Sequence, residues 1–370
     1  MTTMSIRAQT IQPASSLRKA SRIAAQTLII ALGCCCFGQQ AAPATASAPT
    51  PVAESTPATA ALDVFTAPSL KRTGKPVFPL SEVGTGREGW VVLSTMVDAT
   101  GKPYAVTVVD STGNTKFERS AQRWMESQTF EPATSRGAPI DAAYRYKLIF
   151  KSDYDASAAH SFATAYRTAH AAIGSGDRAG ADVALQGMKI QTLYEDALYN
   201  LCQFLYFQKW GTGEQQLKAL NAAIAHEKQD RYLPKDVFRG AVRAMFALQV
   251  STADYAGALE TYDKLDANTK LKPAVVKAMA GIRKLATDKR AFSVAGEIDR
   301  RGTWYITLLK RHFTADVLTG KLAEIKLRCD RKYVFFRYES ALQYSISDGF
   351  GRCQLELIGD PGTTFKLQQS

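Results

Sequence analysis

The stretch that decides the fold is KPVFPLSEVGTGREGWVVLSTMVDATGKPYAVTVVDSTG at residues 75–113, followed by FERSAQRWMESQTFEPA at 117–133 and AAYRYKLIF at 142–150. Short apolar runs interrupted by glycine-containing turns predict strands, and the 3.6-residue period between them predicts a helix. We therefore expect three strands and one helix. Together they would make a small α+β unit of about 75 residues, close to the lower limit for independent folding.

The side-chain pattern assigns each of these elements. Val91, Leu93 and Val97 fall on one face of the first strand, while Trp90, Ser94 and Met96 fall on the other. A turn that contains Gly101 leads to the second strand, since glycine readily adopts a positive φ. Apolar residues at positions 117, 121, 124 and 125 build one helix stripe, and alternate residues from 144 to 150 form one face of the last strand.

In this order and spacing, the segment resembles the C-terminal domain of TonB, a periplasmic protein-binding module. The resemblance covers residues 70–152 and rests on VFPLSEVGTGREGWVVL, VDATGK, VVDSTG, FERSA and FEPA. Similar domains bind an extended peptide from an outer-membrane transporter against a sheet edge. The resemblance thus implies a docking edge on the last strand, at Tyr144, Arg145, Tyr146, Lys147 and Leu148.

The first 38 residues have the pattern of an export signal. Basic residues precede an uncharged run, Ile23–Gly38, which is shorter than the roughly 20 residues that span a membrane comfortably. Three fates remain open: lipidation of Cys34 as in a lipoprotein, cleavage at the A-x-A site at 44–46, or retention as an anchor. Each fate places the rest of the chain on the periplasmic side of a Gram-negative cell envelope.

Residues 39–66 are rich in Ala, Pro and Thr and predict an extended linker, because this composition cannot bury a core. TonB proteins carry a much longer linker. They also carry a His in the transmembrane helix for coupling to a proton channel, and Ile23–Gly38 contains none. Both departures argue against energy transduction.

Residues 153–289 are rich in alanine and predict helices with few strand signals. Similar segments begin at His170, Phe204 and Ala244. Each contains the end of one predicted helix, a short polar turn and the start of a second helix. Their turns lie about 36 and 41 residues apart, which resembles the period of tetratricopeptide helix pairs. A stacked array would offer a concave protein-binding surface, and a plain helical bundle is the alternative.

Residues 290–370 predict a β-rich domain, either a sandwich or a barrel, with about six short strands between 292 and 367. Cys329 and Cys353 fall on the apolar faces of two of these strands. In an oxidising compartment we expect them to form a disulfide. Cys202 lies in an apolar helix stripe and is expected to be a buried free thiol.

Composition and motifs argue against nucleic-acid binding and catalysis. The net charge is +12, but Lys and Arg are spread along the chain, so we expect no nucleic-acid partner. The G-x-G-x-x-G sequence at 84–89 precedes a strand, whereas a dinucleotide site follows one. The four histidines are scattered without zinc-ligand spacing, so no catalytic residue, metal or cofactor is predicted. Adjacent carboxylates such as Glu195 and Asp196 are assigned to solvated helix faces.

The fold class is therefore multidomain α+β: a TonB-like domain at 67–152, helical repeats at 153–289 and a β domain at 290–370. The function expected is that of a non-catalytic periplasmic scaffold or adaptor linked to TonB-dependent transport. Its partners would be envelope proteins, such as an outer-membrane transporter or its accessory proteins, with membrane association through the N-terminus. The alternative is an inner-membrane-anchored energy transducer of the TonB type.

Overall fold

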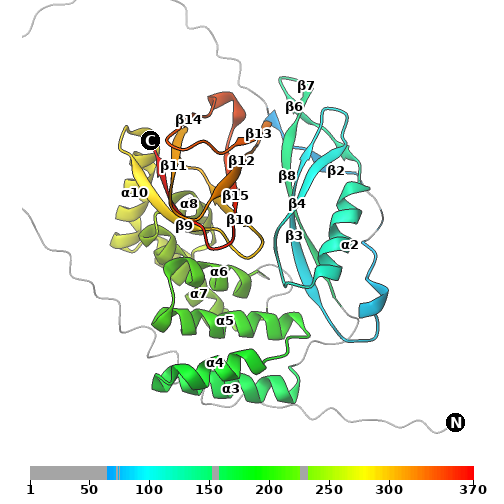
Figure 1. Cartoon of the computed structure of the whole chain (residues 1–370), viewed down its shortest axis with the longest axis vertical. Coiled ribbons are helices and arrows are strands. Elements are labelled where there is room, and N and C mark those ends of the chain that lie inside the picture. The colour runs from blue at the N-terminus through cyan, green and yellow to red at the C-terminus, as the bar shows by residue number, and fades with distance from the viewer. Residues whose placement is uncertain (1–64, 72–73, 75, 152–157, 226–231) are drawn as a thin grey trace, which may run out of the picture. The chain divides into compact units, whose positions relative to one another are not determined.

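The computed structural model describes residues 65–71, 74, 76–151, 158–225 and 232–370. The predicted export signal, the lipidation of Cys34 and nearly all of the linker lie outside these described residues. None of the helices in the described ranges is both long enough and apolar enough to span a bilayer. The described residues form three regions, which belong to one compact unit of the chain (Figure 1).

The first region, the α+β region, contains the predicted strands and helix. Its sheet is antiparallel in the order β4-β3-β8, formed by β3 (Gly89–Val97), β4 (Pro103–Ser111) and β8 (Ala142–Phe150). Helix α2 (Thr115–Glu126) begins at Asn114, whose side chain accepts a hydrogen bond from the Lys116 amide. The shorter elements are β1 (Phe65–Thr66), β2 (Ser69–Leu70), η1 (Leu80–Glu82), β5 (Phe130–Glu131), β6 (Ala133–Ser135) and β7 (Ala138–Ile140).

Helix α2 packs on one face of this sheet, which we call the inner face. Val91 and Leu93 of β3 are fully buried there, as is Phe117 of α2. The Phe117 ring stacks on Phe150 of β8 with 4.7 Å between ring centroids. The apolar helix stripe predicted from the sequence is therefore the face of α2 that packs on the sheet.

The second region is helical and is built from successive helix pairs. Its helices are α3 (His160–Ser175), α4 (Arg178–Gly187), α5 (Leu193–Trp210), α6 (Gly213–Ala223), α7 (Lys235–Ser251), α8 (Tyr255–Lys264), α9 (Ala267–Lys270) and α10 (Pro273–Thr287). Helix α3 packs on α4, α5 on α6, and α7 on α8. The tetratricopeptide-like ancestry of these pairs stays a prediction.

The second helix of each pair begins with a side-chain cap at the predicted turn. Asp177 accepts a hydrogen bond from the Gly180 amide, and Asp254 accepts one from the Gly257 amide. A β-carbon at Gly180 would lie 2.1 Å from the Asp177 carboxylate, so a larger residue there would displace the capping side chain. Thr212 caps α6 in the equivalent position. The small residues that follow these turns therefore serve the caps as well as the packing.

The third region is all β. Its strands are β9 (Phe292–Glu297), β10 (Thr303–Thr307), β11 (His312–Thr319), β12 (Leu322–Cys329), β13 (Lys332–Arg337), β14 (Tyr344–Ser345), β15 (Cys353–Gly359) and β16 (Thr364–Gln369). They form two antiparallel sheets, β10-β15-β12-β13 and β14-β11-β16-β9, whose buried residues share one core. Strands β11 and β14 were not expected from the sequence. Strand β11 carries polar residues at 312, 314 and 316, and β14 has only two residues.

The structure confirms the predicted cysteine chemistry. Cys329 and Cys353 are bonded, and they face each other directly on β12 and β15 with their Cα atoms 3.9 Å apart. Both are buried in the core of the β region. Cys202 is a buried free thiol, and burial raises the pKa of this group to about 12, so that it stays protonated.

Candidate functional site

Strand β8 is an edge strand of the α+β sheet. In the described part of the chain its only strand partner is β3, and the opposite side of β8 pairs with no strand. An unpaired strand edge presents main-chain donors and acceptors that another extended segment can complete. This edge coincides with the segment predicted from the sequence.

The hydrogen-bond pattern of β3 identifies the main-chain groups on that edge. The Trp90 carbonyl accepts a hydrogen bond from the Thr112 amide, and the Asp98 amide donates to the Lys102 carbonyl, so even-numbered residues of β3 face β4. Odd-numbered residues of β3 therefore bond to β8, because successive residues of a strand alternate sides. They lie opposite even-numbered residues of β8, such as Tyr144 and Tyr146. The main-chain groups of residues 143, 145, 147 and 149 consequently point to the open edge.

The predicted side chains do not all lie on that edge. Tyr144, Tyr146 and Leu148 pack on the inner face, where the Tyr146 ring stacks on Trp124 at 5.4 Å. Lys147 turns toward the outer face, with its ammonium 5.2 Å from the Trp90 ring, and donates to the Ala225 carbonyl. Of the five predicted residues, only Arg145 has an exposed side chain. The site is therefore defined by main-chain groups more than by side chains.

The outer face of the sheet, which carries Trp90, Ser94 and Met96, is also buried. Strands β12 and β13 of the β region come within 8 Å of β8, measured between Cα atoms, and also contact β4. Since α2 covers the inner face, both faces are closed by the chain itself. Within the described residues, two edges of this sheet then have no strand partner, those of β4 and β8, and the segment predicted from the sequence lies on β8.

Arg328 of β12 makes the central contact on the outer face. Its guanidinium donates to the Ala105 carbonyl at 2.6 Å and to the Thr107 hydroxyl at 2.7 Å, both on β4. Its Nε lies 3.5 Å from a carboxylate oxygen of Glu356, and both side chains are almost fully buried. The guanidinium also lies 5.0 Å from the Tyr333 ring. Ala105 has a φ of 50° at an irregularity of β4.

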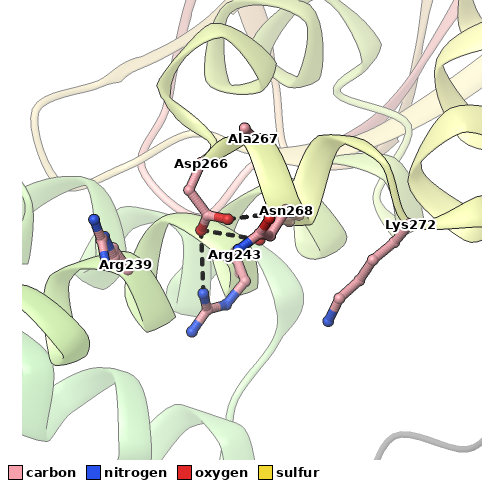
Figure 2. Close-up of a pocket in the computed structure, with 7 residues that line it drawn as sticks. Arg239, Arg243, Asp266, Ala267, Asn268 and Lys272 are labelled. Carbon is pink, nitrogen blue, oxygen red and sulfur yellow. Dashed lines mark hydrogen bonds and ion pairs between the residues drawn. The ribbon is translucent and has the colours of Figure 1, made fainter.

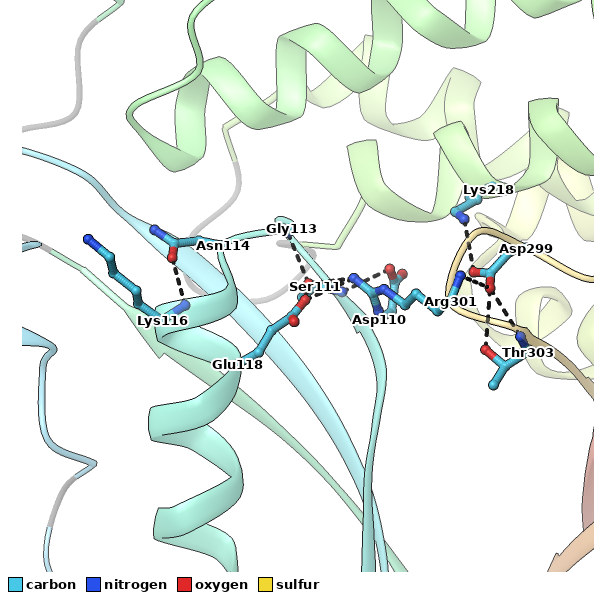
Figure 3. Close-up of polar contacts among 10 residues, drawn as sticks. All are labelled: Asp110, Ser111, Gly113, Asn114, Lys116, Glu118, Lys218, Asp299, Arg301 and Thr303. Carbon is cyan, nitrogen blue, oxygen red and sulfur yellow. Dashed lines mark hydrogen bonds and ion pairs between the residues drawn. The ribbon is translucent and has the colours of Figure 1, made fainter. Parts of the chain in front are cut away.

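A second polar contact joins the β9–β10 turn to the same sheet (Figure 3). Arg301 donates to the Ser111 hydroxyl at 3.0 Å and to a Glu118 carboxylate oxygen at 2.9 Å. Asp299 of this turn lies 3.6 Å from the Lys218 ammonium of α6. Burial raises the pKa of the neighbouring Asp110, and the nearby cations oppose this shift. All three regions therefore meet around the end of β4.

The third contact joins β3 to α5. The Trp90 indole donates to Asp196 at 3.0 Å, and the other oxygen of Asp196 accepts from the Asn200 amide at 3.1 Å. Glu88, just before β3, accepts from the Leu193 amide at the start of α5. Glu195 is fully buried and accepts from the amides of Ala159, Gln191 and Thr192. The assignment of Glu195 and Asp196 to solvated faces is therefore wrong, because both carboxylates hold helix ends and the α+β region in place.

Asp196 should make the stability of the protein depend on pH. Burial raises the pKa of Asp196 to about 6, whereas an unfolded Asp titrates near 3.9. The folded state therefore binds this proton more tightly, so the stability from Asp196 rises as the pH falls through 6. Between pH 7 and pH 5 the gain should be about 1.3 kcal/mol. Asp196→Asn keeps an acceptor for Trp90 and should abolish this gain.

Urea unfolding at the two pH values measures this difference between the wild type and the variant. Burial raises the pKa of Glu214 to about 7, and this group titrates in both proteins, so the difference between them reports Asp196 together with its repulsion from Asp110. Equal pH dependence in the wild type and Asp196→Asn would contradict the assignment.

Other sequence signals receive simple structural explanations. Gly84 and Gly86 of the G-x-G-x-x-G sequence have positive φ values of 77° and 70° in the loop before β3. Within the described residues, no group of three or more His, Cys, Asp or Glu side chains could hold a metal ion. Sequence reasoning missed Arg301 and Arg328, since nothing in their local sequence indicates contact with residues about 200 positions away.

Comparison with known proteins supports the predicted resemblance for one part of the chain. Residues 74–152 match the family described as the C-terminal part of the Gram-negative bacterial TonB protein. Among solved structures, the chain is similar to the TonB C-terminal domain of Pseudomonas aeruginosa, determined by NMR in solution. That match has 23% identity and a TM-score of 0.23, and it covers 25% of this chain and 92% of the other. The curated proteins include no match.

Proposed function

We propose that this protein is a non-catalytic adaptor on the periplasmic side of a Gram-negative cell envelope. Its α+β region captures an extended segment of a partner protein along the edge of β8. The partner class is an envelope protein, such as an outer-membrane transporter or an accessory protein of TonB-dependent transport. The match of residues 74–152 to the TonB C-terminal family supports this class of function.

One observation carries the proposal: among the described residues, one edge of β8 pairs with no strand, and both faces of its sheet are covered. A partner that adds a strand gains main-chain hydrogen bonds without displacing packed side chains. Arg145, whose main-chain groups point to this edge, is itself exposed. Each hydrogen bond contributes about 0.5–1.5 kcal/mol, so several are needed for useful affinity.

Arg145→Pro is expected to reduce partner capture by at least about tenfold, or about 1.4 kcal/mol. Proline removes the amide at 145, which points to the open edge, and leaves the hydrogen bonds from β8 to β3 in place. The matched control is Arg145→Ala, which removes the side chain and keeps the amide, and its capture should fall only modestly. Capture is measured by pulling down cross-linked envelope proteins with the tagged full-length chain.

Tyr146→Pro provides the fold control for this experiment. The Tyr146 amide faces β3, so this variant should lose a hydrogen bond inside the sheet and lower the unfolding temperature. Arg145→Pro should keep an unfolding temperature close to that of the wild type. If Arg145→Pro remains folded and captures partners as well as Arg145→Ala does, the edge of β8 is not the docking site.

A further inference from the structure

The helical region has a surface pocket that is lined by several positively charged side chains (Figure 2). These side chains are far in sequence from the α+β region. It has a volume of about 340 Å3 and lies between α7 and the segment that joins α8 to α10. Arg239 and Arg243 line it from α7, and Asp266, Thr269 and Lys272 line it from the joining segment. The pocket is a feature separate from the β8 edge.

The three cations line one pocket because of their positions on the helices. Arg239 and Arg243 are four residues apart on α7, so they share one helix face. Lys272 is the residue before α10, and its side chain extends toward the side on which Arg243 lies (Figure 2). Within the described residues, neither Arg239 nor Lys272 forms an ion pair with a carboxylate.

Asp266 is the one carboxylate in the pocket, and its oxygens are occupied. One oxygen accepts from the Thr269 amide at 2.9 Å, and the other accepts from the Thr269 hydroxyl at 3.0 Å and from Arg243 at 3.3 Å. The hydrogen bond from the Thr269 amide is the main cause that lowers the pKa of Asp266. Three cations and one carboxylate leave two positive charges without a counter-ion. Asp266 therefore orients Arg243 while leaving the pocket cationic.

The chemistry of the lining selects the kind of ligand. Apart from Ala267, every residue that lines the pocket is polar or charged, so the pocket does not suit an apolar ligand. The planar guanidinium of arginine matches two oxygens of a phosphate, and lysine adds a point charge. A water molecule occupies about 30 Å3, so the pocket has room for a phosphate and part of the molecule that carries it. Two unpaired positive charges match a phosphate dianion.

We infer that this pocket binds a phosphate monoester or inorganic phosphate. Arg239 and Lys272 supply the charge that the ligand neutralises, and Arg243 is held in position by Asp266. The ligand is either free in the periplasm or part of a lipid headgroup, since both present the same chemistry.

Isothermal titration calorimetry of the full-length chain with inorganic phosphate tests this site, with chloride adjusted to keep the ionic strength constant. The double variant Arg239→Gln with Lys272→Gln should weaken binding by at least about tenfold. This variant retains Arg243, Asp266 and the cap of α9, and circular dichroism should confirm its helix content. The matched control is Lys277→Gln with Arg283→Gln, which removes two exposed cations of α10 outside the pocket and should bind as the wild type does.

Vesicles of phosphatidylcholine, with and without phosphatidic acid, distinguish the two sources of phosphate. Binding of inorganic phosphate that the pocket variant loses supports a free ligand. Binding to vesicles that requires phosphatidic acid, and that only the pocket variant loses, supports a lipid headgroup. The inference is overturned if the wild type binds neither probe, or if the control variant loses as much binding as the pocket variant.

Discussion

Arg328→Met is expected to lower the free energy of unfolding by about 3–5 kcal/mol, because it leaves the buried Glu356 carboxylate without its cation. Both side chains are at most 3% exposed. The variant also removes the hydrogen bonds from the guanidinium to Ala105 and Thr107, which join the β region to β4. The measurement is urea unfolding of the wild type and the variant under identical conditions. Limited proteolysis of the folded variant should show faster cleavage between the regions.

A second variant separates the charge from the packing. Arg328→Met with Glu356→Gln removes both charges and should recover a large part of the lost stability, since no uncompensated carboxylate stays buried. Glu356 also accepts a hydrogen bond from the Tyr305 hydroxyl, and the glutamine side-chain oxygen retains this acceptor. A loss of less than about 1 kcal/mol in Arg328→Met would contradict the role of Arg328 as the bridge between the two regions.

Removal of the Cys329–Cys353 bond should lower the stability of the β region by about 3 kcal/mol. The bonded cysteines are separated by 24 positions, and the cross-link restricts the unfolded chain over that loop. Reductant should therefore destabilise the wild type. Cys329→Ala with Cys353→Ala should unfold at the same denaturant concentration with and without reductant. Mass spectrometry should show that the reductant has opened the bond. If the denaturant midpoint of the wild type is then unchanged, the bond does not stabilise the fold.

The elements of the α+β region could be predicted from the sequence because their determinants are local. The alternation at 91–97 predicted a strand that the structure extends to Gly89–Val97, and the stripe at 117–125 predicted α2. The edge position of β8 came from the family resemblance, because local pattern does not give the order of strands. The inward-facing cysteines could be paired because both lie on apolar strand faces, and the β region holds no third cysteine.

The environment of the candidate site could not be predicted in the same way. Trp90, Ser94 and Met96 alternate with the core residues of β3 as an exposed face would, yet they are buried. Their cover comes from α5 and from β12, and the contact between Arg328 and Ala105 spans 223 positions. Asp196 looked like a solvated helix residue because its burial depends on Trp90, which lies 106 positions earlier. Local periodicity contains no information on such pairings.

If the edge of β8 is the docking surface of this protein, site-specific photo-cross-linking in cells should trap its partners at that edge. A photoreactive residue is placed at position 145 on the edge, at exposed Glu126 on α2, or at exposed Lys277 in the helical region. Cross-linked envelope partners are expected from position 145, and they should be lost when an adjacent edge amide is removed by Ala143→Pro. Cross-links from the helical region alone, with none from position 145, would contradict it.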